Sequence, residues 1–230
     1  MTLAVEALVF DLGGVIVGHD NAMMHQRLAS RCGAAASPER IAQVTSDAHW
    51  ATGRPIADLH QALKLEAAYE GDWPTFCDDF TCHLAIDASM LAFVELLAAR
   101  HRVMIFSNTN QVHWDFLVQA SDGRLGAFER HLSHEVGHAK PSLKSFEIVA
   151  EISRLPPGAM LFFDDVAANV DGARRAGLQA ELFTGEAPLR KLLTERGLMP
   201  DSRRAHPAPR RRRPASCRAS RVGFIVDLIE

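Results

Sequence analysis

Polar side chains follow three short apolar runs of the sequence. Asp11 comes directly after ALVF, Ser107 and Asn108 follow VMIF, and Asp164 and Asp165 follow MLFF. A carboxylate at the end of a buried strand is costly unless another group pairs with it or uses it. These residues therefore predict a shared polar site, provided that the fold brings them together.

Carboxylates from two of these runs would need a cation. Asp11 and Asp164 would repel each other unless a positive ion lay between them, and a set of oxygen-only ligands suits magnesium (Mg2+). The positive charge of a divalent ion would in turn allow an anionic phosphate group to bind beside these carboxylates. The negative charge of that phosphate would also be met by the Ser107 hydroxyl, the Lys140 ammonium and backbone N–H groups near Gly13 and Gly14.

A carboxylate beside a bound phosphate can act as a nucleophile. Asp11 would then attack phosphorus, because carboxylates do form aspartyl-phosphate intermediates. Magnesium and Lys140 would offset the charge on the transferring phosphoryl group. The residues thus predict phosphoryl transfer from a small phosphorylated substrate, with Asp11 and Lys140 as the catalytic residues.

Alternating strands and helices would position these groups. Short branched or aromatic runs predict strands at 7–10, 102–106, 159–163 and 179–183, with a weaker one near 131–133. Helical patterns lie between them, at 89–99, 142–153 and 166–176. This alternation predicts an α/β fold with a parallel sheet and helices on both faces. Because such sheets bind ligands beyond the carboxyl ends of their strands, the polar residues should converge there.

Residues 20–88 interrupt this alternation with amphipathic helical patterns and no strand candidate. They predict a helical insertion that follows the first strand and sits above the sheet edge. The expected organisation is a catalytic core of residues 1–18 and 89–200, an insertion of residues 19–88, and a tail of residues 201–230.

The charge of the chain is unevenly distributed. The chain of 230 residues has a net charge of -3, but residues 202–230 carry +6 and are rich in Arg and Pro, which leaves -9 for the rest. The tail is predicted to be disordered, because it contains little apolar material. A nucleic-acid or membrane-surface arm is the functional alternative, but an incidental extension is favoured.

The sequence contains no pattern typical of export, membrane insertion or a cysteine framework. Glu6 and Asp11 interrupt the apolar N-terminus, and no basic region or cleavage site accompanies it. The four cysteines lack the spacing of a zinc site or a disulfide scaffold. We therefore expect a globular cytoplasmic protein with reduced cysteines, a small-molecule partner and no membrane partner.

Four ordered motifs resemble those of the haloacid dehalogenase (HAD) superfamily of hydrolases. They are FDLGGV, FSNTN, AKP and FFDD with Asn169 following, and the resemblance extends over about residues 5–195. It implies a Rossmann-like parallel sheet with an inserted all-helical cap after the first strand. The motifs are most similar to those of bacterial sugar-phosphate (alpha-glucose-1-phosphate-type) phosphatases and of the N-terminal phosphatase domains of epoxide hydrolases.

The resemblance also implies a role for each motif residue. Asp11 would be the nucleophile, and Asp164 with Asp165 would hold magnesium. Gly13 would lend a backbone carbonyl to the metal, and Asn169 takes the place where many relatives carry another acid. The phosphoryl group would be bound by Ser107 and Asn108 with backbone near Gly14, and Lys140 would steady both it and the nucleophile.

One position departs from the family pattern. Most phosphatases of the superfamily carry a second aspartate two residues after the nucleophile, as general acid and base, and this chain has Gly13 there. Proton transfer of this type contributes roughly a hundred- to ten-thousandfold in rate. Turnover should therefore be slow, or confined to good leaving groups such as those of sugar 1-phosphates. Alternatively, another group supplies the proton, and His19 and Asp20 are candidates because they lie close in sequence.

Other interpretations stay open at this point. A 2-haloacid dehalogenase would use the same Asp11 and Ser107 without a metal, although the Asp164–Asp165 pair disfavours it. A phosphate- or partner-binding protein with weak turnover would fit the glycine at position 13. Each motif alone is also typical of an ordinary turn or helix cap. His49, Trp50, Arg54, His113 and Trp114 are further pocket candidates, although packing is favoured for the first three.

Overall fold

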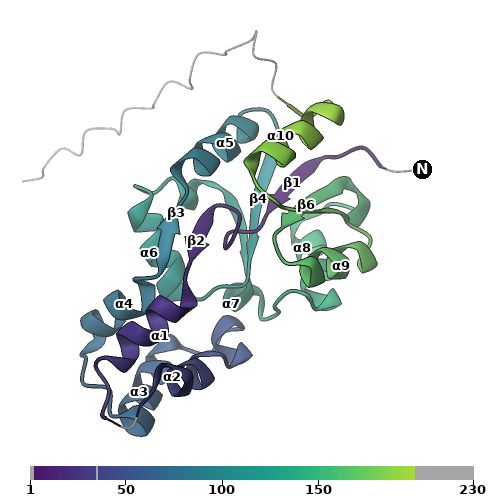
Figure 1. The fold of residues 1–230 in the computed structure, drawn as a ribbon. Coiled ribbons are helices and arrows are strands. Elements are labelled where there is room, and N and C mark those ends of the chain that lie inside the picture. Colours follow the sequence, from purple (N-terminus) through teal and green to yellow (C-terminus); the bar gives the residue numbers. More distant parts are fainter. Residues whose placement is uncertain (1–2, 35, 200–230) are drawn as a thin grey trace, which may run out of the picture. The chain divides into compact units, whose positions relative to one another are not determined.

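A five-stranded parallel sheet forms the centre of the fold (Figure 1). The computed structural model describes residues 3–34 and 36–199. The strand order is β5-β4-β1-β6-β7. The strands are β1 (Ala7–Phe10), β4 (Arg102–Ser107), β5 (Glu129–Leu132), β6 (Met160–Asp164) and β7 (Gln179–Leu182). The predicted fold class is confirmed, and the weak fifth strand lies at one edge of the sheet.

Successive residues of the central strands bury opposite faces of the sheet. Leu8 and Phe10 belong to one hydrophobic core, whereas Ala7 and Val9 belong to the other. This explains why β1 is apolar at every position, since a strand covered on both faces has no solvent side. Ser107 and Asp164 are the last residues of β4 and β6, and Asp11 follows β1 directly.

Helices cover both faces of the sheet. The core that contains Leu8 is completed by residues of α5 (Ala88–Ala98), α6 (Gln111–Ala120) and α10 (Glu186–Glu195). The core that contains Val9 is completed by α8 (Leu143–Ser153) and α9 (Ala167–Arg175). Short connections complete the body: α7 (Ser133–Val136), η2 (Leu125–Ala127) and η3 (Pro157–Ala159). The predicted helices agree with α5, α8 and α9 to within one residue at each end.

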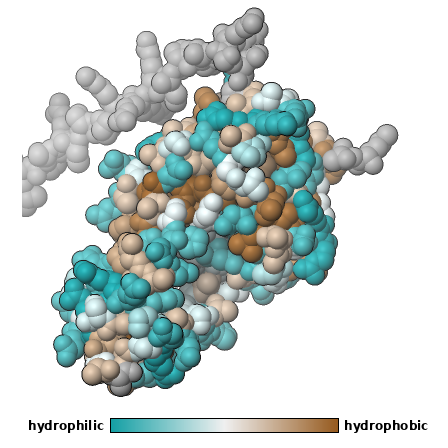
Figure 2. Space-filling view, in the orientation of Figure 1, coloured by the Kyte–Doolittle hydropathy of each residue, from teal (hydrophilic) through white to brown (hydrophobic). Residues whose placement is uncertain are grey.

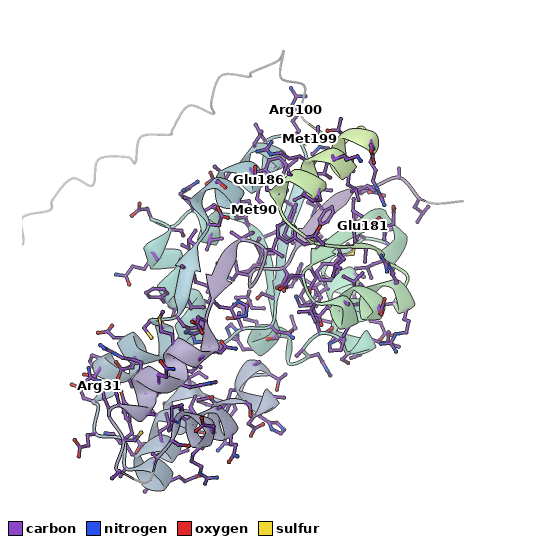
Figure 3. All side chains as sticks on the ribbon, in the orientation of Figure 1. Arg31, Met90, Arg100, Glu181, Glu186 and Met199 are labelled. Atoms are coloured by element: carbon purple, nitrogen blue, oxygen red, sulfur yellow. The ribbon has the colours of Figure 1, made fainter. Side chains whose placement is uncertain are left out.

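Residues 20–83, called the insertion from here on, form a separate group of helices (Figure 1). Its elements are α1 (Asn21–Ala29), α2 (Pro38–Thr45), η1 (Ala48–Ala51), α3 (Ile56–Ala67) and α4 (Trp73–Thr81). They share a hydrophobic core of their own, centred on Leu28, Leu59 and Phe76. Arg31, labelled in Figure 3, lies in the insertion, far from the sheet.

The prediction that residues 20–88 contain no strand is wrong. β3 (Leu84–Ile86) pairs antiparallel with β2 (Val17–His19), so that Val17 lies opposite Ile86. A strand of three residues is too short to display an alternating pattern, which is why the sequence did not reveal it. The ribbon of β2 and β3 connects the insertion to the sheet body, and the domain boundaries at 18/19 and 88/89 stay a prediction.

The surface differs between the two parts of the described chain. Figure 2 shows hydrophobic residues gathered over the sheet body on this face, whereas the insertion is mainly hydrophilic there. None of the helices among the described residues is long and apolar enough to cross a membrane. The predictions for the tail fall on residues 201–230, outside the described residues, and they stay predictions.

Candidate active site

The carboxyl ends of β1, β4 and β6 open into a pocket between the sheet body and the insertion. Its volume is about 510 Å³. Because Phe10 is in register with Ile105 and Phe163, Asp11 lies level with Asp164, and Ser107 lies one residue further along β4. The predicted site residues that line the pocket are Asp11, Gly13, Ser107, Asn108, Lys140 and Asp165. The predicted convergence of distant motifs at one sheet edge therefore occurs.

Lys140 links the two buried carboxylates. Its Nζ atom lies 2.8 Å from Asp11 Oδ1 and 2.6 Å from Asp164 Oδ2, and it donates to the carbonyl of Phe106 at 2.9 Å. An ammonium has three N–H donors, so each has an acceptor here. The Lys140 side chain is fully buried. It is thus a fixed positive charge beside Asp11, as the sequence predicted.

Asp164 has a fully buried side chain that is held on both oxygens. Its Oδ1 accepts from the Val166 backbone at 2.8 Å and from Asn169 Nδ2 at 3.0 Å, and the same amide lies 3.1 Å from Oδ2. Asn169 therefore orients this carboxylate. The neutral amide of Asn169 offsets less of the Asp164 charge than a cation would, but, unlike another acid at this position, it adds no repulsion.

Three acids lie close enough to hold one cation. Carboxylate oxygens of Asp11, Asp164 and Asp165 all lie within 4.8 Å of one another. Burial raises the pKa of Asp11 from 3.8 to about 7, with nearby Lys140 acting in the opposite direction and Asp164 adding to the rise. A carboxylate with a raised pKa gains most from a divalent cation. The donor set, oxygen atoms only, fits magnesium.

Two glycines shape the floor of the site. A Cβ atom at Gly14 would overlap the Asp165 carboxylate, and Gly14 has a left-handed backbone with φ of +73°. Glycine therefore lets Asp165 approach the chain after β1. At Gly13 a Cβ atom would instead lie in ordinary contact, 3.6 Å from Nδ1 of His19.

Asn108 has a role that the sequence did not reveal. Its Nδ2 donates to the Lys140 carbonyl, and its Oδ1 accepts from the Lys140 backbone N–H, each at 2.8 Å. The side chain thus fastens the loop that carries Lys140 to the end of β4. Its predicted contact with a phosphoryl group, like that of Ser107, stays a prediction.

The insertion supplies the opposite wall of the pocket. The lining residues that come from it are Asn21, Met24, His25, Thr45, Ser46, Asp47, Ala48, Trp50, Ala51, Phe80 and His83. Of the residues considered from sequence, Trp50 and His113 line the pocket, whereas His49, Arg54 and Trp114 do not. The hydroxyls of Thr45 and Ser46 gave no signal in the sequence, because ordinary helix ends carry the same residues.

The structure separates the two candidates for proton transfer. His19 lines the pocket beside Gly13. Asp20 does not line it, and instead accepts hydrogen bonds from the backbone of Ala22 and Met23 as the N-cap of α1. Its carboxylate therefore stabilises the first turn of α1, and His19 is the candidate that faces the pocket.

Comparison with known proteins identifies one relative along most of the chain and another along a short segment of it. A D-ribitol-5-phosphate phosphatase from Bacteroides thetaiotaomicron is 25% identical over 213 residues, which is 83% of this chain and 97% of that protein. Phosphatase MT3486 from Mycobacterium tuberculosis is 42% identical over 50 residues, 22% of this chain and 23% of that protein.

Solved structures share the fold. The HAD family enzyme BT-2542 from Bacteroides thetaiotaomicron, in complex with magnesium and inorganic phosphate, superposes with a TM-score of 0.69 at 20% identity, covering 80% of this chain and 96% of that one. A HAD-like hydrolase from Porphyromonas gingivalis gives a TM-score of 0.72 at 22% identity, covering 83% and 98%. At this level of identity, these matches bear on the fold alone.

The family itself is identified by the sequence. Residues 5–177, three quarters of the chain, match the haloacid dehalogenase-like hydrolase family. The matched range contains every motif residue that lies at the pocket, from Asp11 to Asn169. The chain therefore belongs to the haloacid dehalogenase-like hydrolases.

Proposed function

We propose that this hydrolase is a magnesium-dependent phosphatase that acts on a small phosphorylated metabolite through an aspartyl-phosphate intermediate. The observation that carries the proposal is the position of Asp11, at the pocket, 2.8 Å from the Lys140 ammonium and within 4.8 Å of two further acids. A nucleophile, a fixed positive charge and a cation site thus meet at one point.

Each residue contributes a separate part of the mechanism. Asp164 and Asp165, with Asp11, would hold magnesium, and the backbone carbonyl of Gly13 is a further candidate ligand. When bound, the ion supplies positive charge to the phosphoryl oxygens. Asp11 attacks phosphorus with one carboxylate oxygen as the bond from phosphorus to the leaving oxygen breaks, and that oxygen takes up a proton from water. A water molecule then attacks the aspartyl phosphate, which releases inorganic phosphate and restores the Asp11 carboxylate.

Lys140 and the end of β4 keep the nucleophile ready. Lys140 stabilises the ionised form of Asp11 and offsets charge as the phosphoryl group transfers. Ser107 offers a hydroxyl at the pocket, and Asn108 holds the Lys140 loop through two hydrogen bonds. The backbone N–H groups near Gly14 are the remaining phosphate donors in this proposal.

The relatives support a substrate of the sugar- or polyol-phosphate class. One relative along most of the chain is named a D-ribitol-5-phosphate phosphatase, and a structural neighbour holds magnesium with inorganic phosphate. A 2-haloacid dehalogenase from Pseudomonas syringae shares the fold with a TM-score of 0.58 at 15% identity. The three-acid cluster favours the phosphatase, since dehalogenation uses no metal.

Phosphate release from p-nitrophenyl phosphate tests the proposal. The purified protein should release phosphate with magnesium and stop when EDTA is added, and Asp11→Asn should lose at least a thousandfold in rate. Asp171→Asn is the matched control, because Asp171 is an exposed acid on α9. Chloride release from 2-chloropropionate without metal, or full activity of Asp11→Asn, would overturn the proposal.

A further inference from the structure

His25 of the insertion lines the pocket with one ring nitrogen held by the protein and the other unpaired. It lies on α1 and is partly exposed. Its Nε2 atom lies 3.1 Å from Oγ1 of Thr45, the last residue of α2. Its Nδ1 atom bonds to none of residues 3–34 and 36–199. A molecule bound in the pocket is therefore a candidate partner for Nδ1.

The unpaired nitrogen of His25 keeps accessible surface. Among the described residues that are not exposed, only Nδ1 of His83 is both unpaired and closed off from solvent. Nδ1 of His25 is unpaired without being closed off in this way, and because the residue lines the pocket, a ligand there can reach it. The pocket volume of about 510 Å³ is typical of sites for small molecules. His25 can thus contact a substrate that occupies the pocket.

The contacts of Thr45 decide which nitrogen of His25 carries the hydrogen. Thr45 Oγ1 lies 3.0 Å from the Ile41 carbonyl and 3.3 Å from the Ala42 carbonyl. Carbonyl oxygens only accept, so the single hydroxyl hydrogen is directed to them, and Oγ1 accepts from the Nε2–H of His25. Burial lowers the pKa of His25 from its ordinary value of 6.5, so the ring is neutral near pH 7. Nδ1 therefore presents a lone pair, which makes it a hydrogen-bond acceptor.

A second polar side chain lies beside His25 on the same face of α1. Asn21 comes one helical turn before His25 and also lines the pocket. Residues four apart share a face of a helix. The Asn21 side chain is exposed, and its amide bonds to no other residue in the described part of the chain. This face of α1 therefore suits a hydroxylated group, since an apolar one would cover both polar side chains without pairing them.

We propose that Nδ1 of His25 accepts a hydrogen bond from a hydroxyl group of the leaving alcohol and thereby selects substrates that carry a donor at that position. The inference rests on the proposed phosphatase function and names a specificity residue for it. His25 belongs to the wall that the insertion supplies, opposite the sheet edge, so it contacts the part of the substrate that leaves. A lone pair requires a donor, so a substituent that cannot donate leaves Nδ1 unpaired and binds less well.

Analogues of a single substrate test the inference. The parent compound is the best substrate in a panel of five- and six-carbon sugar and polyol phosphates, assayed with magnesium. Each hydroxyl group is replaced in turn by hydrogen and by fluorine, neither of which can donate a hydrogen bond. At one position, both replacements should lower kcat/KM about tenfold, mainly through KM, because the acceptor on His25 is left unpaired. A hydroxyl that only accepts would tolerate fluorine better than hydrogen.

Two variants at position 25 identify the acceptor. His25→Gln places its amide near the position of Nε2 and has no atom at Nδ1, so the parent and its fluorinated analogue should become equal substrates. His25→Asn places its amide near Nδ1, so it should keep part of the difference. Gln26→Asn is the matched control, because Gln26 is the exposed neighbour on α1 outside the pocket lining, and it should keep the full difference. Thermal melts followed by circular dichroism show whether each variant is folded.

The outcomes separate the two proposals. If the wild-type protein with magnesium releases no phosphate from p-nitrophenyl phosphate, the proposed function itself fails. If it releases phosphate from that compound but from no panel member, or if every fluorinated analogue is as good a substrate as its parent, the inference about His25 is overturned. The wild-type comparison gives this result even where a variant does not fold. A difference that persists in full in folded His25→Gln would likewise remove His25 from substrate selection.

Discussion

At the scale of single residues, Lys140 has a fully buried side chain with an acceptor for each of its three donors. Its ammonium is enclosed by Asp11, Asp164 and the Phe106 carbonyl, and it lies 5.2 Å from the ring centroids of Phe106 and Phe162. A buried cation in this setting compensates two carboxylates at once. Its removal leaves both of them without a counter-charge.

Lys140→Met should therefore reduce both activity and stability. We expect phosphate release to fall below detection and the free energy of unfolding to drop by about 3 kcal/mol, since breaking a buried ion pair costs roughly 3–5 kcal/mol. Urea denaturation measures the second quantity. Lys144→Met, at an exposed lysine of α8 paired with Glu147, should change neither. A stable Lys140→Met variant would show that the carboxylates are compensated in another way.

Adjacent glycines offer a matched pair of substitutions. Gly14→Ala should impair magnesium-dependent activity, because the new Cβ would displace Asp165 and the backbone there has a positive φ of +73°. Gly13→Ala should fold normally, because its nearest contact is His19 at 3.6 Å. The magnesium concentration for half-maximal activity distinguishes them, and it should rise at least tenfold only in Gly14→Ala. Equal values would mean that Asp165 does not contribute to metal binding.

At the scale of elements, a buried carboxylate in the insertion connects helices that are distant in sequence. Asp79 of α4 has a 1% exposed side chain and pairs with Arg27 of α1 at 2.8 Å and with Arg31 at 2.6 Å. The Tyr69 hydroxyl also donates to it at 2.8 Å. These contacts fix α1 against α4, and both helices contribute to the pocket wall through Met24, His25 and Phe80.

Asp79→Ala should destabilise the insertion. We expect a loss of about 2 kcal/mol in the free energy of unfolding, since hydrogen bonds to charged groups are worth roughly 1.5–3 kcal/mol and the arginines can still reach water. Arg40→Gln is the control, because the Arg40–Glu66 pair is 51% exposed on both sides and spans 3.4 Å. Similar urea midpoints for the two variants would contradict the conclusion that Asp79 holds α1 against α4.

The contact between α6 and the end of α4 should be sensitive to acid. Burial lowers the pKa of His113 from 6.5 to about 3, so the folded state keeps this imidazole neutral where the unfolded chain would protonate it. A lowered pKa in the folded state means that stability is complete above pH 6.5 and is lost as pH falls toward 3. Between pH 7.5 and pH 5, the protonation of His113 in the unfolded chain should lower the free energy of unfolding by about 2 kcal/mol.

His113→Gln removes this titration. The variant should be less stable than the wild type at pH 7.5, but its free energy of unfolding should fall by about 2 kcal/mol less on acidification to pH 5. Urea denaturation at the two pH values measures the difference. His101→Gln, at the residue before β4, serves as the control for a histidine outside the pocket. Parallel pH dependences in the wild type and His113→Gln would contradict a neutral buried His113.

At the scale of the whole molecule, the acidic cluster connects metal binding to folding. A cation that binds the carboxylates of Asp11, Asp164 and Asp165 in the folded state alone raises stability by mass action. Magnesium at a hundred times its dissociation constant should add about 2.7 kcal/mol. The melting temperature should therefore rise with magnesium and return to its starting value with EDTA. Asp165→Asn should reduce the rise, and an equal rise in that variant would place the ion elsewhere.

The fold and the meeting of the motif residues at one sheet edge were largely predictable from sequence, for a physical reason. Apolar strands that end in polar residues are visible locally, and a parallel sheet then brings those ends together, as it does for Asp11 and Asp164. The hydrogen bonds of Asn108 to the Lys140 backbone were not predictable, because they depend on how two loops approach each other. The short strand β3 was missed because three residues are too few to show an alternating pattern.

The ribbon of β2 and β3 has a consequence for how such a chain can diverge. Because Val17 lies opposite Ile86, the backbone leaves the sheet body and returns to it at adjacent points. A segment of any size can be accommodated between those points without moving a strand of the sheet. The pocket wall that the insertion supplies can therefore change in size and sequence over evolutionary time while the residues at the sheet edge are kept.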